Sequence, residues 1–450
     1  MRRLRNTEHD AQWPAAKHIL GCPPLTCDEY VADVSVVVSM AWLADARNKV
    51  FLAVGIMGLL AILSSTMSKN PVLNLFAASL GTPEAWSGIV ASASTIPGIL
   101  ASLPAASLSD VVGRKKMLLA SGFLFASAPF AYLFVTDWWQ LIPVRFYHGF
   151  ATAVFVPVAE ASVAELFPDK RGERLSLFSS VTSVGRVAAP FLGGYILFAT
   201  GQSFSTLYLG VAAAGVSAFI IGAVLLAEER GLVSGRQTRD AQKHVRLVFR
   251  GWRTVTRNRG VLATSVVQAS QYYVFGAVEF FLVGYMKDVG LDSLLIGAVM
   301  GVQLAGATIV KPLIGRLSDR IGRRTPIILG SVMGGLPLLA VPFARDFSVL
   351  LALSATYGLG FASVTACTSA LASELAGADN VGTAMGFIDT IMDVGQTAGP
   401  IVTGLITATS LGYAASFPAL TAVMLLSCLV FVASRVGAKS TIQSEFVLRP

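Results

Sequence analysis

Long apolar runs alternate with short polar segments along the chain from residue 50 to residue 434. Each run is long enough to cross about 30 Å of hydrocarbon as a helix, in some cases with tilt. Because unpaired backbone groups are costly in lipid, the pattern predicts an all-α membrane protein with twelve transmembrane helices. The predicted spans are residues 50–79, 86–107, 117–136, 140–163, 175–200, 207–227, 262–286, 292–314, 326–344, 347–372, 383–408 and 414–434.

Composition supports a membrane protein and excludes several other classes. Of the 450 residues 54% are hydrophobic and 13% are charged, whereas soluble proteins carry about 25% charged residues. The four cysteines, at positions 22, 27, 367 and 428, show neither a disulfide framework nor zinc-site spacing. No GxxxxGK[ST] loop is present, so we do not expect ATP to be the driver. We also expect no enzyme activity, no metal and no cofactor.

Basic residues are concentrated in alternate loops, and this asymmetry predicts the orientation of the chain. Because short cytoplasmic loops are enriched in Lys and Arg, we expect these loops and both termini to be cytoplasmic, in a plasma or inner membrane. The same asymmetry explains the net charge of +8 without a nucleic-acid partner. The basic loops contain Arg114, Lys115, Lys116, Lys170, Arg171, Arg174, Arg316, Arg320, Arg323 and Arg324.

The long polar segments divide the chain into five predicted parts. A polar tail (1–49) precedes a six-helix bundle (50–227), and a second bundle (262–434) precedes a short tail (435–450). The segment between the bundles, 228–261, interleaves basic with apolar residues. We expect it to form an amphipathic helix on the inner leaflet that tethers the two halves.

The two halves repeat at an offset of 209 or 210 residues. Asp110 is followed by Val-Val-Gly-Arg-Lys, and Asp319 is followed by Arg-Ile-Gly-Arg-Arg. Gly81 corresponds to Gly290, and Glu165 corresponds to Glu374. A duplicated bundle of this kind is typical of secondary transporters, in which parallel repeats are related by an axis along the membrane normal.

The segment Gly315–Arg324 resembles the loop motif of the major facilitator superfamily. The first-half copy departs from it, since Ala106 replaces the leading glycine and Val111 replaces an arginine. The resemblance implies two pseudo-symmetric bundles with substrate bound between them. It also implies that Asp110 and Asp319 engage a helix of the other half and steady one conformation; the alternative is a topology anchor. The motif residues are Asp110, Gly113, Arg114, Lys115, Gly315, Asp319, Arg320, Gly322, Arg323 and Arg324.

Small residues recur every four positions in the fifth span. Such spacing allows close helix packing, and a proline there favours a bend. The pattern resembles the glycine-proline motif of major facilitator drug antiporters, although alanine replaces its middle glycine; plain packing is the alternative. The residues are Gly185, Ala189, Pro190, Gly193 and Gly194, with counterparts Gly395, Gly399, Pro400 and Gly404 in the second half.

Charged residues at membrane depth indicate a cavity, because they are costly in lipid. Asp389, Asp393 and Gln396 share one face of the eleventh span, and Arg186 occupies a matching depth in the first half. We therefore expect these residues to act on substrate or protons. A purely structural pair between Arg186 and an aspartate is the alternative.

Further candidates lie in the first, fourth and seventh spans. Lys69 is predicted to meet Glu279 in an outer gate when the protein faces inward. Arg145, followed by Gly149, resembles a fourth-span pattern linked to proton coupling; alternatively, its side chain extends to the outer surface. Glu160, Glu279 and Asp393 are unranked candidates for the proton carrier. Gln268, Gln271 and Tyr272 are predicted to line the pocket.

Together these features predict a monomeric secondary transporter that exports a small amphipathic compound in exchange for protons. An importer of metabolites or sugars is one alternative. A membrane sensor that binds ligand without transporting it is another, from a different functional class.

Overall fold

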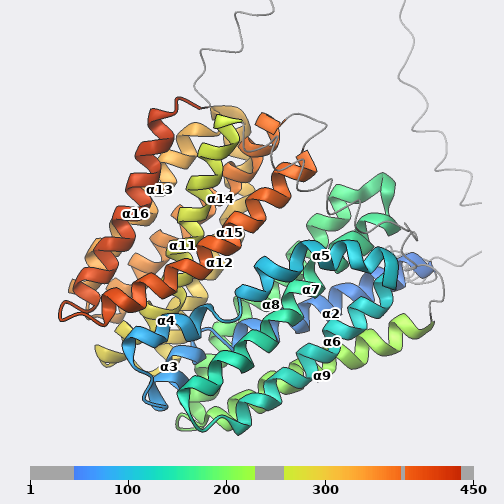
Figure 1. Ribbon diagram of the computed structural model, residues 1–450, viewed down its shortest axis with the longest axis horizontal. Coiled ribbons are helices and arrows are strands. Elements are labelled where there is room, and N and C mark those ends of the chain that lie inside the picture. The colour runs from blue at the N-terminus through green and yellow to red at the C-terminus, as the bar shows by residue number, and fades with distance from the viewer. Residues whose placement is uncertain (1–44, 229–257, 377–380, 437–450) are drawn as a thin grey trace, which may run out of the picture. The chain divides into compact units, whose positions relative to one another are not determined.

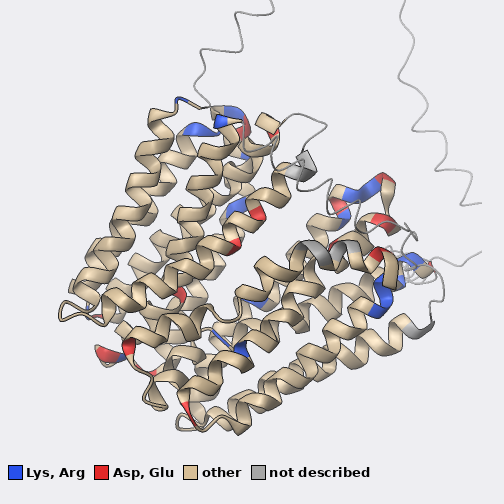
Figure 2. Cartoon of the chain, in the orientation of Figure 1, with Lys and Arg blue, Asp and Glu red and all other residues tan. Residues whose placement is uncertain are grey.

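The computed structural model describes residues 45–228, 258–376 and 381–436, and in these ranges the regular structure is entirely helical. Residues 1–44 of the predicted N-terminal tail, with Cys22 and Cys27, lie outside them, as do most of the linker 228–261 and the C-terminal residues beyond 436. Ten helical segments of the described chain are long and apolar enough to cross a membrane. Figure 2 shows charged residues gathered near the helix ends, with others part-way along the helices.

The first half of the chain forms a bundle in which α6 packs on α7 and α9, and α5 packs on α7. Figure 1 shows this bundle in blue to green. Its helices are α2 (Ala46–Met67), α3 (Val72–Ser79), α4 (Glu84–Ser92), α5 (Ile96–Val112), α6 (Arg114–Ala131), α7 (Leu141–Leu166), α8 (Arg171–Ala199) and α9 (Phe204–Glu228).

The second half repeats this packing, since α13 packs on α14 and α16, and α12 packs on α14. The repeated contacts agree with the duplication predicted from the sequence. Its helices, yellow to red in Figure 1, are α11 (Arg259–Asp288), α12 (Ser293–Ile321), α13 (Arg324–Ala340), α14 (Phe347–Ala376), α15 (Val381–Thr407) and α16 (Tyr413–Ala433).

Two predicted spans are interrupted rather than continuous. The first breaks between α2 and α3 ahead of Pro71, and the second breaks between α4 and α5 ahead of Pro97. Proline lacks the amide hydrogen that would bond the carbonyl four residues earlier, and nearby hydroxyl groups take part in the irregular turns. Ser68 donates to Ser65 O at 2.7 Å, and Thr95 donates to Ser92 O at 2.8 Å.

The loop-motif segment Gly315–Arg324 is mostly helical. Residues 315–321 belong to α12, and only Gly322 and Arg323 separate α12 from α13. Gly322 has φ of +90° and Gly113 has φ of +102°, a backbone region that favours glycine. Because these glycines reverse the chain so sharply, the flanking helices extend beyond the spans that hydropathy predicted.

The two halves meet through glycines at the end opposite the loop motif. Gly194 of α8 faces Ser293 and Gly297 of α12, so closely that a Cβ at Gly194 would lie 2.9 Å from the Gly297 Cα. Gly88 of α4 faces Pro400 of α15 in the same way. These are corresponding helix pairs of the repeat, so the same contact forms twice.

The remaining predicted packing residues, apart from Gly404, lie inside the halves. Gly185 approaches the backbone of α2 at Leu59, and Gly193 contacts Met67 and Val72. Ala189, between them, is buried. In the second half Gly395 and Gly399 approach the backbone of α11, whereas Gly404 faces Gly88 of the other half.

The glycine contact between α8 and α12 makes a direct prediction. Gly194→Ala places a methyl group against the backbone of α12 and should destabilise the protein by about 1–3 kcal/mol through overpacking. Gly193→Ala is the matched control, because its Cβ would meet side chains at 3.4 Å or more, an ordinary distance. Thermal unfolding of the purified variants should therefore show a lower Tm for Gly194→Ala only; equal values would contradict the close backbone contact.

Candidate functional site

A polar cavity lies between the two halves, lined by α2, α5, α7, α8, α11 and α15. Its volume is about 440 Å³. A second hollow of about 710 Å³ shares Glu160, Arg186 and Tyr272 with it, and continues along α8 and α12 toward the loop-motif end. Pockets for drug-sized molecules measure about 300–1,000 Å³, so the space suffices for such a ligand.

Nine of the eleven residues predicted for the pathway line this central cavity. They come from four helices and from the α2–α3 turn, yet they converge on one space, as charged side chains in a membrane protein are expected to do. These residues are Lys69, Arg145, Glu160, Arg186, Tyr272, Glu279, Asp389, Asp393 and Gln396.

Gln268 and Gln271 do not line it, which corrects the prediction for these two residues. Both are buried inside the second half. Gln268 Oε1 accepts a hydrogen bond from the Thr368 hydroxyl of α14, so α14 covers this part of α11. Spacing along α11 alone cannot show where a neighbouring helix covers the cavity-facing stripe.

The aspartates of α15 face the cavity without a direct counter-charge. Within the described residues neither Asp389 nor Asp393 forms an ion pair, and neither does Arg186. The structural pair between Arg186 and an aspartate is therefore not formed here. Asp393 lies against Gly98 of α5, where a Cβ would come within 2.9 Å of its Oδ2.

The cavity is sealed at the end opposite the loop motif. Lys69 Nζ lies 2.9 Å from Glu279 Oε2, so the predicted contact between these residues is present. Nearby, the Thr397 carbonyl accepts a hydrogen bond from Ser92 at 2.7 Å, and its hydroxyl lies 2.6 Å from the Thr95 hydroxyl. These contacts join α15 and α11 to the first half at the interruptions of the first two spans.

Arg145 is enclosed within the seal. Its side chain does not extend to the outer surface, because it is only 2% exposed and donates to Ser94 Oγ at 2.5 Å. A pocket of about 30 Å³ beside it is also lined by Lys69, Asn70 and Glu279. That volume holds a water molecule, and the Asn70 side chain is a buried amide without a protein partner.

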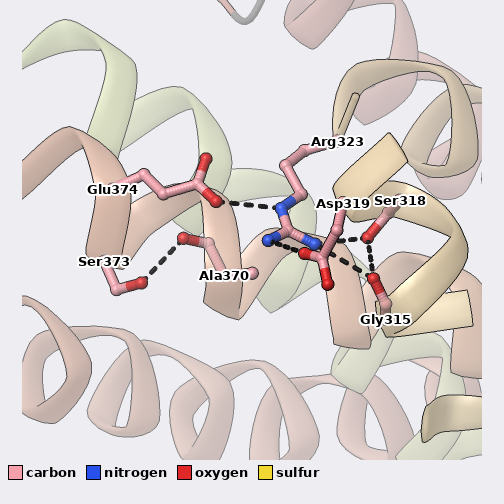
Figure 3. Close-up of polar contacts among 7 residues, drawn as sticks. All are labelled: Gly315, Ser318, Asp319, Arg323, Ala370, Ser373 and Glu374. Carbon is pink, nitrogen blue, oxygen red and sulfur yellow. Dashed lines mark hydrogen bonds and ion pairs between the residues drawn. The ribbon is translucent and has the colours of Figure 1, made fainter. Parts of the chain in front are cut away.

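The loop motif forms the same ion network in each half. Arg114 contacts Asp110 at 2.9 Å and Glu165 at 2.6 Å. Figure 3 shows the second-half copy, in which Arg323 lies between Asp319 and Glu374 and also donates to Ser318 Oγ and the Gly315 carbonyl. The ion-pair partners of both aspartates belong to their own half, unlike the contact across the halves that the resemblance implied.

The remaining basic residues of the motif have different surroundings. Arg324 donates to the Val432 and Val436 carbonyls at 2.8 and 3.0 Å, which ties α13 to the end of α16. Arg320 is exposed on α12, and Lys115 is half-buried. The motif therefore fixes the helix ends within each half, while the hollow along α8 and α12 approaches the same end.

Lys311 of α12 lines the wider hollow together with Arg186 and Glu160, and we did not select it from the sequence. It lies within electrostatic range of Asp389. A usable signal was present, because Lys311 is the only charge within residues 293–314 of that span. A charge isolated in a membrane-length apolar run is a functional candidate by default.

Comparisons with known proteins agree with this architecture. A family model described as Major Facilitator Superfamily matches residues 50–284 and again 264–446. Multidrug resistance protein MdtG of Dickeya zeae is 25% identical over 371 residues, covering 79% of this chain and 87% of that protein. An uncharacterized MFS-type transporter of Methanocaldococcus jannaschii is 23% identical over 337 residues, covering 75% and 86%.

Among solved structures, a bacterial homolog of the human lysosomal transporter Spinster has a TM-score of 0.74 to this chain. It is 15% identical in sequence, and the match covers 87% of this chain and 98% of that one. That structure was described as inward-facing and unoccupied. The likeness extends over both six-helix bundles, so it supports the fold of the whole described chain.

The ion pair at the sealed end yields a prediction about access. Glu279→Gln removes the charge that holds Lys69. Loss of one charge-assisted contact shifts the equilibrium from the sealed toward the open state by about tenfold or more. In a background with the native cysteines replaced, Ala91→Cys beside the small pocket should therefore react about tenfold faster with a polar thiol reagent in the Glu279→Gln variant.

Exchanging the two charges, in Lys69→Glu with Glu279→Lys, is the matched control and should restore slow labelling. Unchanged labelling of the Glu279→Gln variant would show that the ion pair does not stabilise the seal.

Proposed function

Because the chain belongs to the major facilitator superfamily, we propose that it exports a small amphipathic compound in exchange for protons, by alternating access. The observation that carries the proposal is a charged cavity that is sealed at one end and continues toward the other. Its walls combine these charges with aromatic and aliphatic side chains, including Tyr272, Phe275 and Phe155, which suit an amphipathic ligand.

The basic loops favour a cytoplasmic position for the loop-motif end. With that orientation the cavity continues toward the cytoplasm, and the Lys69–Glu279 contact belongs to an outer gate. Substrate then enters from the cytoplasm or the inner leaflet, and it leaves once the seal opens and the loop-motif ends approach. The protein acts as a monomer in the bilayer, since one chain supplies both halves of the pathway.

Asp393 is the carboxylate best placed to couple a proton to this motion. The backbone carbonyl of Asp393 accepts a hydrogen bond from the Thr397 hydroxyl at 2.8 Å, and Thr397 contacts Ser92 and Thr95 of the other half. A proton taken up from outside neutralises Asp393 before the halves close around it, since an unpaired charge there is costly to enclose. Opening toward the cytoplasm rehydrates the carboxylate and releases the proton.

The direction of exchange follows from this order of events. Substrate occupies the inward-open cavity after the proton has left, and protonation from the outside follows substrate release. MdtG, the multidrug resistance relative, agrees with export rather than uptake, as does the resemblance of the fifth span to the drug-antiporter motif.

Efflux of a lipophilic fluorescent dye from cells tests this proposal. Asp393→Asn mimics the protonated carboxylate permanently, so it should abolish uphill efflux while retaining dye exchange at equal concentrations. A protonophore should reduce wild-type efflux to the level of the variant.

Asp169→Asn is the matched control, because Asp169 is exposed in the turn before α8 and should leave efflux unchanged. Wild-type efflux that persists in the protonophore would contradict proton coupling. Uphill efflux retained by Asp393→Asn would exclude Asp393 as the proton carrier.

A further inference from the structure

The charges that line the two adjoining hollows are balanced. Four basic and four acidic side chains contribute to the lining, so the fully ionised set is neutral. A bound cation or anion would give this enclosed set a net charge, which is costly at membrane depth. The eight residues are Lys69, Arg145, Arg186 and Lys311, with Glu160, Glu279, Asp389 and Asp393.

Most of these charged side chains do not form ion pairs with one another within the described residues. Lys69 and Glu279 form the one ion pair among the eight that the described residues contain. Arg145 is held by Ser94 at the sealed end. Arg186, Lys311 and Asp389 lack a direct ion pair there, although Lys311 interacts electrostatically with both Arg186 and Asp389.

The unpaired charges on α8, α12 and α15 are also separated by sign, whereas Glu160 of α7 borders both hollows. Arg186 and Lys311 lie on α8 and α12, helices that pack on each other and form one wall of the wider hollow. Asp389 and Asp393 lie one turn apart on α15, which lines the deeper cavity. Tyr272 of α11 borders both hollows and is in electrostatic range of Arg186 and both aspartates.

We propose that the transported compound is a zwitterion, whose anionic group binds Arg186 and Lys311 and whose cationic group binds Asp389. This inference rests on the proposed export function and specifies the substrate class of the same site. A carboxylate or phosphate between the two basic residues replaces water that they would otherwise need. The cation likewise compensates Asp389, so both walls are satisfied when the halves close.

The apolar lining between the charges fits the body of such a compound. Phe275 borders both hollows, and Leu304 and Phe361 line the wider one. Because Asp393 lies deeper, against Gly98, the proton and the substrate cation occupy different carboxylates. Substrate and proton therefore do not compete for a single acidic side chain, and Asp389 discriminates substrates by charge.

Three fluorescent ligands with one skeleton test the proposal. Nα-dansyl-lysine is a zwitterion, its methyl ester is a cation, and its Nε-acetyl derivative is an anion. Each change removes one ionic contact, so both derivatives should bind the full chain in lipid nanodiscs at least about tenfold more weakly than the zwitterion. Dansyl fluorescence on titration gives the Kd.

Lys311→Met should reduce the preference for the zwitterion over the ester by about tenfold, and Lys311→Arg should restore it. Lys287→Met at the exposed end of α11 is the matched control and should leave the preference unchanged. If Lys311→Met does not fold, Arg186→Gln makes the same test. An ester that binds as tightly as the zwitterion, or a zwitterion that does not bind, overturns the proposal.

Uptake into proteoliposomes under a pH gradient separates this inference from the proposed function. If the gradient moves the ester while the zwitterion fails to bind, the substrate class is wrong and proton-coupled export stands. If the zwitterion binds most tightly but the gradient moves none of the three ligands, the substrate class stands and proton-coupled export is wrong.

Discussion

The cost of placing charge in hydrocarbon is the constraint on which the rest of this structure depends. Eight charged side chains from membrane-length helices or their interruptions line the central hollows. Enclosing them requires two bundles that meet along polar faces while each presents apolar faces to lipid. The cavity is therefore a consequence of the charge pattern, and its contents must stay compensated whenever the halves close.

Close approach of the two halves depends on glycines, which have no side chain at the contact. Gly194 with Gly297 and Gly88 with Pro400 bring corresponding helix pairs together, and the Thr397 hydroxyl contacts Thr95 beside the second pair. Such contacts separate without exposing large apolar surfaces. At the other end the ion networks of Arg114 and Arg323 each lie within one half. They therefore keep the helix ends of each bundle joined to one another when the seal opens.

The sequence predicted most of the fold because lipid imposes length and hydropathy on every span. It also predicted most of the cavity, since Asp389, Asp393 and Arg186 are isolated charges at matching depths of a repeat. The interruptions at Pro71 and Pro97 were not predicted. A proline alone does not indicate an interruption, because Pro190 and Pro400 lie inside continuous helices. Only local polar hydrogen bonds distinguish the interrupted helices from the continuous ones. The prediction for Gln268 was wrong because its hydrogen bond to Thr368 depends on how α14 packs on α11. The spacing of residues along one helix gives no information about that packing.

The central claim is that the two ends open alternately, and paired spin-label distances test it most directly. In a background without native cysteines, labels at Lys116 and Thr325 report on the loop-motif end, and labels at Asp137 and Arg345 report on the sealed end; all four positions are exposed. Lowering the pH on the outer side should shorten the distance between the labels at the loop-motif end and lengthen the distance between the labels at the sealed end. Distances that stay fixed, or that change in the same direction, would contradict alternating access.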